Sequence, residues 1–73
     1  MRPDLPAGRA DFGERLRARR LSLGMTSEAL AFAVGVGRHT VLAWESGRAM
    51  PSLLLLGRLG AVLRVPFDEL TLW

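Results

Sequence analysis

The sequence predicts a single all-α domain built from five short helices. Apolar residues recur at the three- and four-residue spacing of one helix face. The clearest series is Leu53, Leu56, Leu59 and Leu63. Residues that end helices separate these stretches, and they are Gly24, Gly35, Ser46-Gly47 and Pro66. No stretch alternates apolar and polar residues with the period of a strand, no hairpin turn such as Asn-Gly occurs, and 73 residues leave room for one small domain only.

The first ten residues differ in composition from the rest of the chain. Residues 1–10 contain two prolines and one glycine, which is typical of a loose arm. We therefore expect a flexible arm over residues 1–10 and a folded domain over residues 11–73. The first helix is expected to begin at Asp11, because Asp11 and Glu14 have the spacing of a capping box. Gly24 is placed to end this helix.

The next two helices are short and follow each other closely. Thr26 is a favourable N-cap for the second helix, which we expect to end at Val34-Gly35 because glycine accepts a positive φ there. The third helix is expected from Gly37 or Arg38 to Glu45. Such a short connection permits only a tight crossing, which leaves the outer face of the third helix free to enter a DNA major groove. The residues expected to share the core beneath it are Leu30, Val36, Val41 and Trp44.

A fourth helix is expected from Ser52 to about Leu63, with its leucine series facing the core. After Pro66, residues 67–71 are expected to form a last turn or short helix. Gly57 and Gly60 each lose roughly 1 kcal/mol of helix preference relative to alanine. Their presence indicates that the fourth helix packs closely against another element.

Positive charge is concentrated near the start of the chain. All ten basic residues are Arg against seven acidic residues, and residues 1–20 hold six of these Arg with three acids. Any attraction to phosphate is therefore expected in the first third of the chain. Arg15, Arg17 and Arg19 on the first helix form either a solvated face or a DNA contact. Arg2 and Arg9 in the arm either enter a minor groove or make no contact.

Residue types that serve catalysis or bind metals are scarce. The chain has one His, no Cys and no Lys, and its acids are scattered over separate helix ends. We therefore expect no enzyme activity, no cofactor, no metal and no small-molecule substrate. The most apolar stretch, residues 53–65, is interrupted by two Arg and is shorter than the roughly 20 residues that span a bilayer. Without a signal peptide pattern, we expect a cytoplasmic protein with no membrane partner.

Several spaced motifs occur along the chain. They are Phe12-Gly13-Glu14-Arg15-Leu16, Arg20, Gly24-Met25-Thr26, Leu30-Ala31, Val34-Gly35-Val36, Arg38, Thr40-Val41, Trp44-Glu45, Gly47, Pro51-Ser52-Leu53, Leu63, Val65 and Phe67-Asp68-Glu69-Leu70. In this order, the stretch from Phe12 to Leu70 resembles the Cro/lambda-repressor-type (xenobiotic-response-element-like) helix-turn-helix family of bacterial and phage regulators. The resemblance implies a five-helix lambda-repressor-like DNA-binding domain with a central helix-turn-helix motif at about residues 26–45. In that family the second helix lies across the DNA backbone and the third reads bases.

The resemblance implies two groups of DNA contacts in this chain. The residues expected at base edges are Gly37, Arg38, His39, Leu42 and Ala43. The residues expected at the DNA backbone are Arg20, Thr26, Ser27, Thr40, Ser46 and Arg48. Arg38 can bind O6 and N7 of guanine together, whereas His39 can form one hydrogen bond. The resemblance also implies that Arg20 pairs with Glu45, which would tie the first helix to the third and hold Arg20 toward phosphate. The alternative is an ordinary surface ion pair worth at most about 1 kcal/mol.

Four positions depart from the usual pattern of the family. Ser27 stands where a glutamine often contacts phosphate. Gly37 stands where serine usually caps the third helix, a loss of a few tenths of a kcal/mol. Leu42 and Ala43 stand where polar residues are usual, and apolar side chains there can touch a thymine methyl but cannot donate to base edges.

Apolar residues also occur at positions of the family that are usually polar. Phe32, Leu54 and Leu55, with Leu72 and Trp73 at the C-terminus, are expected to form a homodimer or partner interface. Clustered exposed apolar residues often mark such interfaces. The alternative is that the N-terminal arm buries the fourth helix on all sides.

Residues and resemblance together predict a sequence-specific DNA-binding transcriptional regulator. It is expected to be a repressor that binds a two-fold operator in double-stranded DNA as a homodimer, with the third helix in the major groove. The alternative is a protein-interaction module with the same fold, such as a toxin-neutralising antitoxin or an adaptor. Only the first has an operator whose selection Arg38→Ala would abolish.

Overall fold

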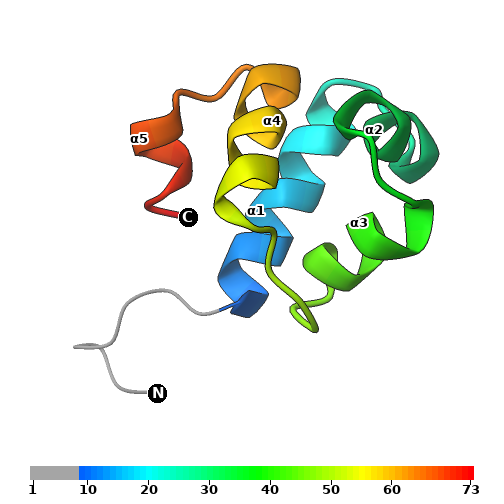
Figure 1. The fold of residues 1–73 in the computed structure, drawn as a ribbon, viewed down its shortest axis with the longest axis horizontal. Helices are drawn as coiled ribbons and strands as arrows, with labels where there is room; N and C mark the ends of the chain where they lie inside the picture. The colour runs from blue at the N-terminus through cyan, green and yellow to red at the C-terminus, as the bar shows by residue number, and fades with distance from the viewer. Residues whose placement is uncertain (1–8) are drawn as a thin grey trace.

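Five helices make up residues 9–73, the part of the chain that the computed structural model describes. They are α1 (Arg9–Ser22), α2 (Ser27–Val34), α3 (Arg38–Glu45), α4 (Leu53–Leu63) and α5 (Phe67–Leu70). Helix α3 packs against both α1 and α2, whereas α4 packs against α2 and α5 (Figure 1). The predicted all-α fold with five helices is confirmed, and no strand occurs among these residues.

Helix α1 begins earlier than the sequence predicted. It starts at Arg9, two residues before the expected start at Asp11. The rest of the expected arm, residues 1–8, lies outside the described residues. Asp11 sits in the first turn of α1 rather than at its N-cap, which rules out the capping box with Glu14. Its negative charge still lies at the positive end of the helix dipole.

The ends of α2 and α3 follow the predicted caps. The Thr26 hydroxyl accepts a hydrogen bond from the Ala29 amide at 3.0 Å. Gly35 ends α2 with φ 92° and donates its amide to the Ala31 carbonyl at 2.8 Å. Gly37 is the N-cap of α3 and, as expected, supplies no side-chain hydrogen bond. Because these caps act locally, they fix the tight turn between the two helices.

One core holds the five helices together. Its buried apolar residues are Phe12, Leu16, Leu30, Ala31, Val34, Val41, Trp44, Leu59, Leu63, Val65 and Leu70. Trp44 is among the largest fully buried side chains. Helix α1 passes so close to the end of α3 that a β-carbon on Gly13 would lie 2.6 Å from the Trp44 carbonyl oxygen and even nearer to that of Glu45. The fold therefore depends on glycine at this crossing.

Helix α4 buries most of the predicted leucine series, since Leu59 and Leu63 are fully buried and Leu56 packs against the core. It begins at Leu53, with the Ser52 hydroxyl accepting a hydrogen bond from the Leu55 amide at 3.3 Å. Leu53 was expected in the core and is 74% exposed, whereas Leu55 packs against the core. Four consecutive leucines at residues 53–56 leave the helical phase undecided at this end. Gly60 does allow a close approach, since a β-carbon there would lie 2.9 Å from the Val65 carbonyl oxygen, but Gly57 faces open space.

Candidate nucleic-acid interface

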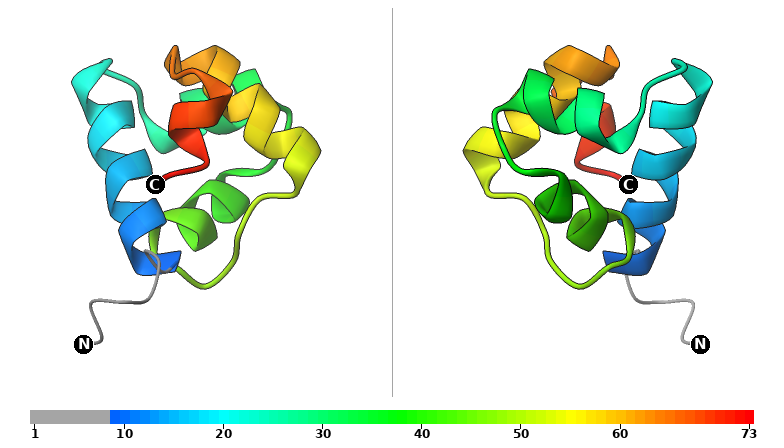
Figure 2. Two further views of the ribbon diagram at one scale, coloured as in Figure 1. Left: turned by 90° about the vertical axis from the view of Figure 1, so that its left-hand side faces the viewer. Right: turned by 90° about the vertical axis from the view of Figure 1, so that its right-hand side faces the viewer.

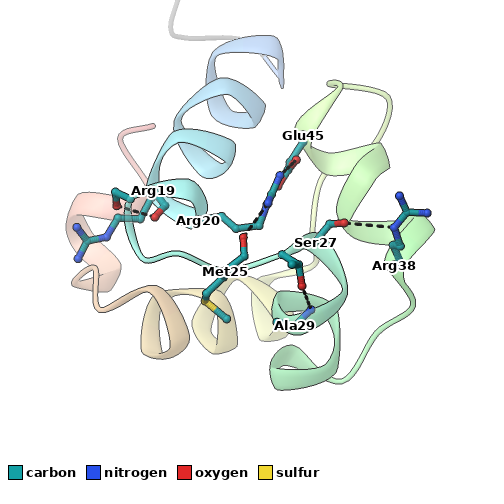
Figure 3. Close-up of polar contacts among 9 residues, drawn as sticks. Arg19, Arg20, Met25, Ser27, Ala29, Arg38 and Glu45 are labelled. Carbon is teal, nitrogen blue, oxygen red and sulfur yellow. Dashed lines mark hydrogen bonds and ion pairs between the residues drawn. The ribbon is translucent and has the colours of Figure 1, made fainter.

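The first residues of α2 and α3 meet on one face of the molecule. The guanidinium Nε of Arg38 donates a hydrogen bond to the Ser27 hydroxyl at 3.3 Å, joining the starts of the two helices (Figure 3). Both helices lie in front when this face is turned toward the viewer (Figure 2, right). We call Thr26, Ser27 and the exposed residues of α3 the α2–α3 face. The structure thus brings together predicted DNA-contacting residues from two separate elements.

The sides of α3 differ in exposure as the helical period requires. Val41 and Trp44 are buried beneath it. Arg38 and His39 are exposed at its first turn. The remaining predicted contacts of the helix are half-buried, and they are Thr40, Leu42 and Ala43. The most accessible polar side chains of α3 are therefore the two that were expected to read bases.

The turn after α3 holds a second arginine. The Ser46 hydroxyl donates to the Ala43 carbonyl at 3.1 Å, and Arg48 Nε in turn donates to the Ser46 hydroxyl at 3.2 Å. Both Ser46 and Arg48 are exposed. This chain of hydrogen bonds orients Arg48 from the end of α3, so both ends of the helix carry an exposed guanidinium.

Arg20 is a buried tether rather than a surface cation. Its side chain donates to Glu45 twice, from Nε at 2.6 Å and from Nη2 at 3.0 Å, and from Nη1 to the Met25 carbonyl at 2.9 Å (Figure 3). The hydrogen bond to Glu45 raises the pKa of Arg20 above its usual value, while burial acts in the opposite direction.

The predicted pair with Glu45 is confirmed, but the expected contact of Arg20 with phosphate is wrong. Arg20 is only 7% exposed, and all three of its nitrogens are engaged inside the chain. From its place on α1, Arg20 instead fixes the segment before α2, through the Met25 carbonyl, and the end of α3, through Glu45.

Other arginines bind the carbonyl groups at helix ends. Arg19 Nε donates to the Leu63 carbonyl at the end of α4 at 2.9 Å, and Arg58 Nη1 donates to the Val34 carbonyl at the end of α2 at 3.3 Å. Cations at the carbonyl end of a helix complement its dipole. Arg19 and Arg20 are therefore engaged in hydrogen bonds within the chain. Fewer of the arginines in the first third of the chain are free to attract phosphate than the charge count predicted.

The predicted interface residues separate into two groups. Phe32 is 90%, Leu54 67% and Leu72 75% exposed. The other two, Leu55 and Trp73, pack against the core of their own chain, and the Trp73 ring lies 6.3 Å from that of Phe12. These two residues are half-buried in their own chain, so they offer less apolar surface to a partner than the other three. Leu53 is also exposed, although its place in the leucine series predicted a core position.

Two other kinds of feature were sought in the described part of the chain, a metal site and a membrane-spanning helix. Among residues 9–73, no three His, Asp or Glu side chains gather where they could hold a metal ion. Over the same range, no helix is long and apolar enough to cross a membrane.

Comparison with known proteins identifies the family of the α2–turn–α3 unit. The helix-turn-helix family (HTH_3) matches residues 16–70. The chain belongs to the helix-turn-helix family. A helix-turn-helix transcriptional regulator of Methanothermobacter thermautotrophicus, itself uncharacterized, is 48% identical over 48 residues, which are 66% of this chain and 70% of that protein.

Solved structures of helix-turn-helix proteins share the whole fold. The restriction-modification controller protein C.AhdI from Aeromonas hydrophila has a TM-score of 0.80 and 35% identity, over 85% of this chain and 94% of that one. The P22 c2 repressor, solved in complex with a synthetic operator, has a TM-score of 0.77 and 36% identity, over 81% of this chain and 89% of that one. These matches confirm the predicted lambda-repressor-like fold. With the family match, they place the chain among DNA-binding helix-turn-helix transcriptional regulators.

Proposed function

We propose that this helix-turn-helix regulator is a repressor that binds a two-fold operator as a homodimer, with α3 in the major groove. The observation that carries the proposal is the convergence of two helix starts on one exposed face. The start of a helix presents unpaired amide groups and the positive end of its dipole. Two such ends beside an exposed arginine favour a polyanionic partner.

Arg38 is the central residue of the proposed interface. Within residues 9–73 its Nε alone is engaged, by the Ser27 hydroxyl at 3.3 Å, so both terminal nitrogens are available for O6 and N7 of one guanine. His39 follows with one hydrogen bond, and Leu42 and Ala43 are placed to contact thymine methyl groups.

The DNA backbone contacts of the proposal come from the edges of the α2–α3 face. Thr26 and Ser27 lie at the amide end of α2, where phosphate binds readily. Arg48 and Ser46 supply a cation and a hydroxyl beyond the end of α3, and Thr40 lies between the two groups. Arg20 is not among the proposed backbone contacts, because its side chain is buried.

The outer face of α4 is the proposed dimer contact. Leu53 and Leu54 are exposed there, and the space beside Gly57 is open. Exposed apolar side chains beside a glycine suit the close approach of a second helix, and a two-fold axis lets the same face serve both protomers. Such a dimer would present two copies of α3 about 34 Å apart along one side of the duplex.

Selection of bound fragments from random duplex DNA tests the proposal. We expect one enriched motif with two inverted half-sites about ten base pairs apart. Arg38→Ala should abolish enrichment without unfolding the protein. The matched control is Arg64→Gly, which removes the same charge at a position where φ of 59° suits glycine. Absence of any motif would refute the proposal in favour of a protein-binding role, which the exposed Phe32 and Leu54 would then serve.

A further inference from the structure

The imidazole of His39 lies against the backbone of Gly37 at the start of α3. A β-carbon added to Gly37 would lie 2.8 Å from Cε1 and 3.0 Å from Nδ1 of the ring. Non-bonded carbon atoms ordinarily stay about 3.5–4.0 Å apart. The ring therefore occupies the space that any larger residue at position 37 would need.

The backbone of Gly37 does not itself require glycine. Its φ of −81° and ψ of 158° lie in the extended region that every residue adopts. Serine, threonine, aspartate or asparagine at this N-cap would add the side-chain hydrogen bond that α3 lacks. With glycine at position 37, α3 lacks a side-chain N-cap, although the backbone angles there do not require glycine. What it provides is room for the imidazole.

We propose that Gly37 determines operator specificity through His39. Without a side chain at position 37, the imidazole folds back over the start of α3, and this orientation selects the base pair that faces it. The inference rests on the proposed function of the α2–α3 face. His39 touches DNA, and Gly37 is a positioning residue.

The ring is the movable group at this end of α3. His39 is exposed, whereas its neighbour Arg38 is held by the Ser27 hydroxyl at 3.3 Å. An exposed side chain changes rotamer more easily than a helix moves its backbone. A β-carbon at position 37 therefore turns the ring outward and leaves α3 in place.

Proton NMR of the free protein tests the orientation of the ring. We expect a nuclear Overhauser effect between Hε1 of His39 and the α-protons of Gly37 in the wild-type protein. In Gly37→Ala the ring signals should shift as the ring moves away. Ala61→Gly is the matched control and should leave them unchanged, since Ala61 is exposed on α4 and not on the helix that carries the ring. Absence of the wild-type effect would overturn the inference.

A double-mutant cycle on the selected operator tests the consequence. Gly37→Ala should change the preference between bases at one position of each half-site by about fivefold or more, the low end of what one altered base pair costs. In the His39→Ala background the same substitution should change it by less than about twofold, because contacting residues are coupled. Equal effects in both backgrounds would overturn this inference, while the proposed binding of the protein to its operator would still stand. Failure of the wild-type protein to select any operator would overturn the inference and the proposed function together.

Discussion

Replacing Gly13 by alanine tests the crossing that fixes α3 to the rest of the molecule. The added methyl would lie 2.6 Å from the Trp44 carbonyl oxygen and nearer still to that of Glu45. Both neighbours are backbone atoms, and Glu45 is tied to Arg20 by two hydrogen bonds, so neither yields without moving α3. Overpacking against backbone atoms that cannot yield is expected to cost about 3 kcal/mol, the upper end of the usual range. Alanine returns about 1 kcal/mol of helix preference, which leaves a net loss of about 2 kcal/mol.

Urea denaturation followed by circular dichroism measures that loss. In a thermal denaturation experiment on a domain of this size, a loss of 2 kcal/mol would lower Tm by roughly 8–16 °C. The comparison needs one fixed protein concentration, because dimerisation alters apparent stability. Ala18→Gly is the matched control, since Ala18 is exposed on the same helix, and should destabilise the protein by only about 1 kcal/mol through lost helix preference. A Gly13→Ala protein as stable as the wild type would refute the close crossing.

The remaining predictions concern the tether, the dimer contact and the salt dependence. Arg20→Met should destabilise the fold by about 3 kcal/mol, because it leaves the Glu45 carboxylate buried without its partner; a loss below about 1 kcal/mol in urea titration would contradict a buried pair. The raised pKa of Arg20 means that its contribution is fully present below the unfolded pKa and is lost only as pH rises through the folded value. Since the chain has no Lys, Tyr or Cys to titrate near pH 10, its unfolding free energy should be flat from about pH 9 to 11, and a decline in that window would count against the assignment. Leu53→Glu combined with Leu54→Glu should halve the mass in sedimentation while retaining the helical spectrum; an unchanged mass would remove the α4 contact. Two exposed arginines of the interface per protomer predict a slope of log K against log salt of about −4 per dimer, and a slope near −8 would show a much larger cationic footprint.

Local chemistry made the helix ends of the motif predictable from sequence. Thr26 and Gly35 act on backbone groups within five residues of themselves, so their effect is visible in the sequence alone. The start of α1 was missed because Arg9 and Ala10 carry no capping signal. The predicted core positions Leu56, Leu59 and Leu63 of α4 are confirmed, but the exposure of Leu53 was missed because a run of four leucines has no polar residue to mark the outer side.

Long-range contacts limited what the sequence could show of the site. Arg20 and Glu45 are 25 residues apart, and the family resemblance rather than any local pattern pointed to their pairing. The contact of Arg19 with the Leu63 carbonyl spans 44 residues and has no counterpart in the sequence pattern. The charge count therefore could not show that Arg19 and Arg20 are engaged within the fold. The position of the His39 ring over Gly37 depends on the side-chain rotamer, which cannot be predicted from the amino-acid sequence.

Methylation interference on the selected operator tests the central claim most directly, because Arg38 is proposed to bind guanine through N7. Methylation of one guanine N7 in each half-site, with the two guanines about one helical turn apart, should block binding of the wild-type protein. Arg38→Ala, assayed at a concentration where it still binds weakly, should show no such sensitivity. Equal sensitivity of both proteins, or none in either, would contradict the placement of the start of α3 in the major groove.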